Sequence, residues 1–227
     1  METLCDIPLF SALDETLGEQ YGKSCLWKEY GENELVIDED DDTKDLRCVI
    51  SGRVRIINRI AIGKEVILGE MKDGDFFGEI AAIDDETRSA TVTTLTRTKI
   101  CVVPQRIFHE ILTNSKEVSF SVLKVLTNRV RHLNFRLAEQ SFLQAKHRLY
   151  AEIVRLSKPR MGHEGQRSIS PPPIQRVLAE RIGTRREVVS RELNKLEKQG
   201  VIQKNKGALV LVDVAELQRR ISEAWEE

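Results

Sequence analysis

The hydrophobic residues of this 227-residue chain change their spacing twice along the sequence, and this change limits the possible folds more than any single motif. Between residues 25 and 103, short β-branched runs such as "ELVI" and "ATVTTLT" are separated by Asp and Gly turns, which is typical of a β-barrel or sandwich. From about Val118 onward the spacing becomes helical. We therefore expect an α+β protein whose strand-rich part comes first.

One stretch of the helical part has a regular apolar seam. Its members follow spacings of three and four residues, and they are Leu123, Leu126, Val130, Leu133, Leu137 and Gln140. A strict seam of this kind is typical of a coiled coil, whereas a helix packed on its own domain has a wider apolar stripe. The seam favours a homodimer formed through residues 118–143 over packing within one chain.

The charge distribution also divides the chain. Residues 1–143 carry 18 Lys and Arg against 25 Asp and Glu, whereas residues 144–227 carry 17 against 11. A basic half predicts a polyanionic partner, and an uneven surface without a partner is the alternative. The acidic run 38–42, "DEDDD", is expected to be a solvated loop.

Composition and missing motifs exclude several classes of protein. Hydrophobic residues make up 41% and charged residues 31%, as in a soluble globular chain. The sequence has no apolar run near the roughly 20 residues that cross a bilayer, and no signal peptide, so a cytoplasmic protein without a membrane partner is expected. Four scattered cysteines predict buried thiols rather than disulfides or a metal site. With no nucleophile and base pair or phosphate loop visible, we expect no enzyme and no catalytic residues.

The basic half contains a helix, a break and a second helix. Pro173 is suited to opening the first helix, Gly183 and Thr184 break it, and the second is expected over about 185–199. A hairpin turning at residues 205–207 follows. This is the layout of a winged helix-turn-helix that reads DNA, although any solvated pair of amphipathic helices also shows polar residues outward.

A second motif, "GDFFGEIAAIDDETRSATV" at residues 74–92, lies in the strand-rich part. Together with "VLAERIGTRREVVSRELNKLEKQGVI" it resembles the cyclic-AMP receptor protein and fumarate–nitrate regulator superfamily of bacterial transcription factors, over roughly residues 8–215. The resemblance implies a cyclic-nucleotide-binding, jelly-roll-like β-roll at 1–111, a dimerisation helix at 112–143 and a winged helix-turn-helix at 144–227.

The resemblance also implies a nucleotide pocket. In the family, the residue at Arg88 pairs with the phosphate, Ser89 adds a donor and Glu79 accepts from the ribose hydroxyl, roles that suit a guanidinium and a carboxylate. The expected ligand residues are Gly78, Glu79, Ile80, Arg88, Ser89, Ala90, Arg129, Leu133 and Asn134. Leu133 and Asn134 replace two hydroxyl residues that contact adenine in the best-known member, so both cyclic AMP and cyclic GMP stay open. Asp84, Asp85 and Glu86 receive no ligand role, and a surface Arg88 paired with Asp85 or Glu86 is the alternative.

The DNA side of the resemblance implies half-sites like TGTGA in a palindrome, read by Arg186, Glu187 and Arg191. The expected DNA-binding residues are Gln175, Arg176, Arg185, Arg186, Glu187, Ser190, Arg191 and Lys206. RNA polymerase is a further expected partner. Two alternatives stay open, a ligand-independent or cysteine-controlled regulator of the same superfamily and a regulatory subunit of a cyclic-nucleotide-controlled enzyme.

Overall fold

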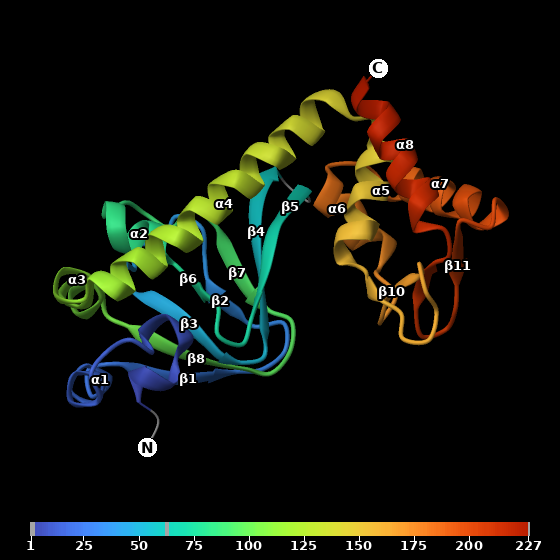
Figure 1. Ribbon diagram of the computed structural model, residues 1–227. Helices are drawn as coiled ribbons and strands as arrows, with labels where there is room; N and C mark the ends of the chain where they lie inside the picture. The colour runs from blue at the N-terminus through green and yellow to red at the C-terminus, as the bar shows by residue number, and fades with distance from the viewer. Residues whose placement is uncertain (1–2, 62–63, 227) are drawn as a thin grey trace. The chain divides into compact units, whose positions relative to one another are not determined.

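The computed structural model describes residues 3–61 and 64–226 and divides into two compact units, Met1–Val130 and Arg131–Glu227. The boundary between the units falls inside the long helix α4, Lys116–Phe142. Figure 1 shows a strand-rich N-terminal unit and a helix-rich C-terminal unit, in the order that the change of hydrophobic spacing predicts.

The first unit contains two antiparallel four-stranded sheets. One sheet has the order β1-β8-β3-β6 and the other has the order β2-β7-β4-β5. The strands of the first sheet are β1 (Leu26–Tyr30), β8 (Thr98–Val103), β3 (Leu46–Ser51) and β6 (Phe76–Phe77). Those of the second are β2 (Leu35–Ile37), β7 (Thr91–Thr94), β4 (Arg53–Ala61) and β5 (Lys64–Lys72). The continuous β-branched run at 47–57, "RCVISGRVRII", forms parts of two strands rather than one, because Gly52 turns the chain with a φ of 101° that favours glycine.

The helices of the first unit lie at its ends and between the strands. They are η1 (Leu4–Asp6), η2 (Pro8–Phe10), α1 (Glu15–Gly22), α2 (Glu79–Asp84), α3 (Gln105–Asn114) and the beginning of α4. The helix expected from residue 112 begins only at Lys116, because Ser115 leaves α3 in an extended conformation. Val118 and Val122 at the start of α4 are buried against Phe108 and Ile111 of α3, which packs this end of α4 onto the first unit.

Three cysteines belong to the apolar core of the first unit. Cys25, Cys48 and Cys101 are buried free thiols, and Cys5 is partly exposed. Cys48 and Cys101 face each other across β3 and β8 in the strand register. Burial raises the pKa of the Cys48 thiol, so this thiol stays protonated and unreactive.

The second unit is a winged helix. Its helices are α5 (Ala145–Leu156), α6 (Gln175–Ile182), α7 (Arg186–Lys198) and α8 (Val214–Glu226). Its small sheet has the order β11-β12-β10-β9, formed by Ile202–Lys204, Leu209–Leu211, Arg167–Ile169 and Lys158–Pro159. The expected hairpin is β11 and β12, and β10 and β9 widen it. No helix in the described residues is long and apolar enough to cross a bilayer.

Candidate functional site

A sharp turn between β6 and α2 carries the first part of the motif at 74–92. Gly78 has a φ of 79°, a conformation in which a side chain is strained. A Cβ added there would lie 2.6 Å from Nη1 of Arg88 and 3.0 Å from the carbonyl oxygen of Asp45. The glycine is therefore needed both for the turn and for the close approach of Arg88.

Arg88 is a buried cation and not a surface residue. Its guanidinium donates to the Thr43 hydroxyl at 3.1 Å, to the Gly78 carbonyl at 3.0 Å and to the Asp45 carbonyl at 2.9 Å. The Asp45 carboxylate lies 3.3 Å from Nη2. Burial lowers the pKa of Arg88, but the group stays charged because arginine is protonated at any physiological pH.

The alternative in which Arg88 pairs with Asp85 or Glu86 does not hold, because Oδ1 of Asp85 instead forms an ion pair with Nζ of Lys44 at 2.8 Å. The acidic run at 38–42 also does more than a solvated loop would. The backbone of Asp40 donates to the carbonyl of Arg88 at 3.1 Å, and the backbone of Arg88 donates to the carbonyl of Asp41 at 3.0 Å. These bonds fix the segment that carries Arg88.

A second buried ion pair lies beside Gly78. Glu79 is 3% exposed, and its carboxylate accepts from Arg129 of α4 at 2.5 Å. Arg129 also donates to the carbonyl of Phe76 at 2.6 Å, and its guanidinium lies over the Phe76 ring at 5.1 Å, a cation–π contact. The structure thus brings Gly78, Glu79, Arg88 and Arg129 to one side of the first unit, and these four residues are called the Gly78 cluster below.

The remaining predicted ligand residues are placed differently. Ile80 and Ser89 are exposed beside this cluster, and Ala90 is half-buried. Leu133 and Asn134 are exposed residues of the second unit. The predicted set omitted Thr43, Asp45 and Arg47. No motif marks these three, because Thr43 and Asp45 meet Arg88, and Arg47 meets Asp45, only when the chain around the start of β3 lies beside the turn at Gly78. The described residues contain no group of His, Cys, Asp and Glu that could hold a metal ion.

The predicted DNA-reading residues lie on one face of α7 and at its start. Val189, Leu193 and Leu196 are buried in the core of the second unit, so the opposite face of this amphipathic helix meets solvent. Arg185, Arg186, Glu187 and Arg191 are exposed and Ser190 is half-buried. Among the described residues neither Arg186 nor Arg191 forms an ion pair, so both guanidiniums are available to an outside acceptor.

The turn before α7 is fixed by side chains from two other helices. The Ile182 carbonyl accepts from Gln140 of α4 and from Arg148 of α5, each at 3.1 Å. Gly183 follows with a φ of 64°. Because these bonds satisfy the end of α6, the start of α7 is held in a defined position on the second unit.

The other DNA candidates lie around α7. Gln175 begins α6, and exposed Arg176 pairs with Glu180 at 2.7 Å. Lys206 is exposed in the turn between β11 and β12. Its neighbour Lys204 binds Glu197 of α7 at 2.9 Å, which joins the wing to the reading helix.

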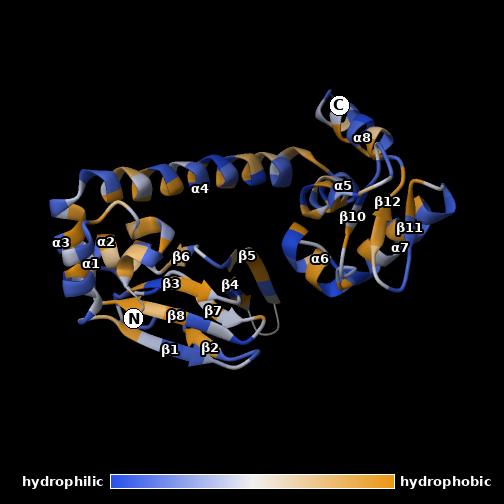
Figure 2. Cartoon of the chain, turned by 60° about the horizontal axis from the view of Figure 1, so that its bottom comes forward, coloured by the Kyte–Doolittle hydropathy of each residue, from blue (hydrophilic) through white to orange (hydrophobic). Residues whose placement is uncertain are grey.

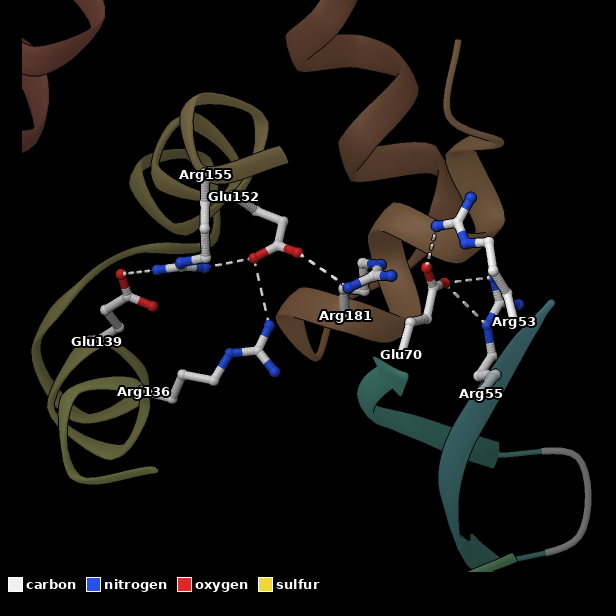
Figure 3. A network of polar contacts seen from close by, with 8 residues as sticks. All are labelled: Arg53, Arg55, Glu70, Arg136, Glu139, Glu152, Arg155 and Arg181. Atoms are coloured by element: carbon white, nitrogen blue, oxygen red, sulfur yellow. Dashed lines mark hydrogen bonds and ion pairs between the residues drawn. The ribbon is translucent and has the colours of Figure 1, made fainter. Parts of the chain in front are cut away.

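A buried ion cluster connects the end of α4 to the rest of the second unit (Figure 3). Glu152 of α5 is 1% exposed and accepts from Arg136 at 3.2 Å and from Arg181 at 3.4 Å, and it also pairs with Arg155. Arg155 in turn binds Glu139 of α4 at 2.6 Å. The last turns of α4 are thereby held on α5 by ion pairs.

Both units match known domain families. Residues 27–115 match the model of the cyclic nucleotide-binding domain, and residues 147–220 match that of the Crp-like helix-turn-helix domain. These domains define a DNA-binding transcription regulator with a cyclic nucleotide-binding domain. The chain belongs to the Crp/Fnr superfamily, as its sequence motifs predict.

Relatives match along most of the chain. A CRP-like cAMP-activated global transcriptional regulator of Mycobacterium tuberculosis is 26% identical over 221 residues, which cover 96% of this chain and 98% of the relative. A CooA mutant from Carboxydothermus hydrogenoformans has a TM-score of 0.79 at 20% identity, over 97% of this chain and 96% of that one. The c-di-GMP responsive regulator CLP of Xanthomonas campestris has a TM-score of 0.74 at 22% identity, over 86% and 98%. These two structures confirm the fold.

Proposed function

We propose that this chain is a homodimeric regulator that binds a cyclic nucleotide, cyclic AMP or cyclic GMP, and then binds palindromic DNA with TGTGA-like half-sites. The proposal rests mainly on the Gly78 cluster, where the buried guanidinium of Arg88 and the buried carboxylate of Glu79 lie beside the same turn. A cyclic nucleotide offers a phosphodiester anion and a ribose hydroxyl, and these two groups suit Arg88 and Glu79.

Dimerisation is supported by apolar side chains that the described residues leave uncovered along α4. Figure 2 shows hydrophobic residues at intervals along this helix. Leu123, Val130, Leu133 and Leu137 are 56%, 54%, 57% and 67% exposed, and all four belong to the predicted seam. A second copy of α4 would bury them in a coiled coil, and Asn134 would then be available to the base of a nucleotide in the partner.

DNA recognition is assigned to Arg186, Glu187 and Arg191. Arginine can bind guanine O6 and N7 with two hydrogen bonds, and glutamate can accept from cytosine N4. Gln175, Arg176, Arg185, Ser190 and Lys206 are proposed to contact the backbone or flanking bases. A symmetric dimer presents two such faces, which is why a palindrome is proposed. We assign RNA polymerase as the partner of the DNA-bound dimer, and the chain acts by binding rather than by catalysis.

Ligand control is proposed as a population shift. A nucleotide that contacts both the Gly78 cluster and α4 would favour one arrangement of the dimer. In that arrangement the two α7 helices lie about one turn of DNA apart and can enter the major groove at both half-sites. Distances between spin labels on the two α7 helices should change on addition of nucleotide. Unchanged distances would remove this mechanism while leaving binding itself intact.

The experiment that tests the proposal is calorimetric titration of the full chain with cyclic AMP and with cyclic GMP, with and without a palindromic TGTGA-type duplex. Arg88→Leu should abolish nucleotide binding, and Arg97→Leu, which removes an exposed arginine of the same unit, should not. Arg186→Ala should cost roughly 1–3 kcal/mol of specific DNA binding and relax one base position.

Two outcomes would redirect the assignment. DNA binding at full strength without any nucleotide would support a ligand-independent regulator. A DNA affinity that does not change with salt concentration would support a protein-binding role for the C-terminal unit. Control by a cysteine is disfavoured, because Cys48 and Cys101 are buried and buried thiols react slowly.

A further inference from the structure

A single carboxylate lies between two buried arginines in the proposed phosphate site. Oδ2 of Asp45 is 2.6 Å from Nε of Arg47 and 3.3 Å from Nη2 of Arg88. The side chains of Arg47, Asp45 and Arg88 are 8%, 19% and 2% exposed. Asp45 thus holds an anionic oxygen against the guanidinium that the proposed function assigns to the ligand.

The donors of Arg88 are largely occupied by the protein itself. Nε donates to Thr43, Nη1 donates to the carbonyl of Gly78, and Nη2 faces both the carbonyl and the carboxylate of Asp45. A guanidinium has five N–H donors, so few are left for a phosphate. Because Nη2 also faces the Asp45 carboxylate, a phosphate that takes two hydrogen bonds from Arg88 must displace a partner of Arg88 or share one with it.

Arg47 makes the displacement of Asp45 feasible. It donates to Asp45 from Nε and to the Val36 carbonyl from Nη1, so it is fixed in place independently of Arg88. A carboxylate that leaves Arg88 keeps its bond to Arg47 and is not left as an unpaired buried charge, which would be costly. Thr43 and Asp45 are also close in sequence, so both partners of Arg88 can move with one segment.

We propose that Asp45 is an internal competitor for the phosphate at Arg88 and thereby sets the affinity of the site for its anionic ligand. This inference rests on the proposed function. Two like charges at a separation of a few ångströms repel by about 1 kcal/mol in water and more in a partly buried site. Removing the Asp45 charge should therefore tighten nucleotide binding, and strengthening its hold on Arg88 should weaken it.

The variant that tests this inference is Asp45→Asn, which keeps the shape and an acceptor for both arginines but removes the charge. The dissociation constants for cyclic AMP and cyclic GMP are measured by calorimetry on the full-length chain. We expect the constant of the better ligand to fall by about tenfold, a change of about 1.4 kcal/mol in binding free energy.

Glu70 provides a matched control in the same unit. Its carboxylate also lies between two arginines, 3.1 Å from Arg53 and 2.9 Å from Arg55 (Figure 3), and it is 17% exposed in its side chain. Glu70→Gln removes the same charge without touching the Gly78 cluster. The dissociation constant of Glu70→Gln should stay within about twofold of the wild-type value, because Glu70 pairs with Arg53 and Arg55 and not with the Arg88 assigned to the phosphate.

Arg47→Gln gives a second and opposite test, which does not depend on whether Asp45→Asn folds. Without Arg47, Asp45 should bind Arg88 more strongly, so the nucleotide should bind more weakly than in wild type. If wild type binds but Asp45→Asn binds equally or more weakly, the competition is refuted and Asp45 instead positions Arg88. If Asp45→Asn binds and wild type does not, the competition is supported. If neither folded protein binds either nucleotide, the proposed function fails and this inference fails with it.

Discussion

Gly183 offers the sharpest test of how the turn before α7 is built. It ends α6 with φ 64° and ψ 50°, and a Cβ added there would lie 3.0 Å from Nε2 of Gln140. That same amide donates to the Ile182 carbonyl at 3.1 Å. Gly183→Ala therefore strains the backbone and also pushes on the side chain that satisfies the end of α6.

The two costs can be worked out separately. Placing alanine in the left-handed region costs roughly 1–2 kcal/mol. Moving Gln140 loses one hydrogen bond, which contributes about 1 kcal/mol. Gly183→Ala should thus lower the free energy of unfolding of the second unit by about 2–3 kcal/mol. Gly200→Ala is the matched control, because Gly200 has a φ of 74° but no atom within 4 Å of an added Cβ, so only the backbone cost applies.

Urea unfolding followed by tryptophan fluorescence can measure this loss in the full chain. The sequence contains two tryptophans, Trp27 in the first unit and Trp225 in the second, and the Trp225 ring lies 6.1 Å from that of Phe135. In a Trp27→Phe background the fluorescence therefore reports the second unit alone. The slope of the transition must stay constant for the comparison of unfolding free energies to hold.

A double-mutant cycle separates the contact from the backbone. In a Gln140→Ala background the contact is absent, so Gly183→Ala should cost no more than Gly200→Ala does. If Gly183→Ala costs no more than Gly200→Ala in the parent background, or if Gln140→Ala leaves its cost unchanged, then the proposed role of Gln140 is wrong.

Three further predictions concern other parts of the chain. Leu137→Lys should convert the proposed dimer to a monomer in light scattering because it places a charge in the seam, whereas Ser121→Lys on the opposite side of α4 should not. Glu152→Gln should destabilise the second unit by about 3 kcal/mol, since it removes the buried anion that three arginines share, and exposed Glu164→Gln should change the unfolding free energy by less than 0.5 kcal/mol. Hydrogen bonds from two arginines on its own helix lower the pKa of Glu216 from 4.5 to about 2. Its contribution to α8 is therefore present above about pH 4.5 and lost as the pH falls toward 2, and Glu216→Gln should flatten the circular-dichroism titration in that window.

The sequence predicts the parts of this structure that depend on local patterns. Val189, Leu193 and Leu196 recur at helical spacing, so the buried face of α7 and its polar face could both be assigned. The turn at Gly183 could be predicted because a left-handed residue after a helix is most often glycine. The seam of α4 could be predicted in the same way, and Leu123, Val130, Leu133 and Leu137 are exposed on the described chain, whereas Leu126 packs partly against the core of the first unit.

The sequence does not predict contacts that arise only when distant strands pair. Arg88 and Asp45 are separated by 43 positions, and no spacing rule relates them. The burial of Arg88 was missed for the same reason, because arginine is rarely buried unless it is paired and its partner could not be seen. Cys48 and Cys101 likewise meet only through the register of β3 and β8.

The shared fold does not determine the ligand of the first unit. A relative in sequence is described as cAMP-activated and a protein of similar fold as c-di-GMP responsive, so these two proteins are described with different effectors. The choice must depend on side chains at the site. In the proposed function, Leu133 and Asn134 stand at the base-contacting positions, and Asp45 shares the arginine assigned to the phosphate. If nucleotide binding is tight in Asp45→Asn for cyclic AMP and cyclic GMP alike, the phosphate site governs affinity and the base adds little. If only one of them gains, Asn134 or Arg129 must contact the base, because the phosphate is the same in both ligands.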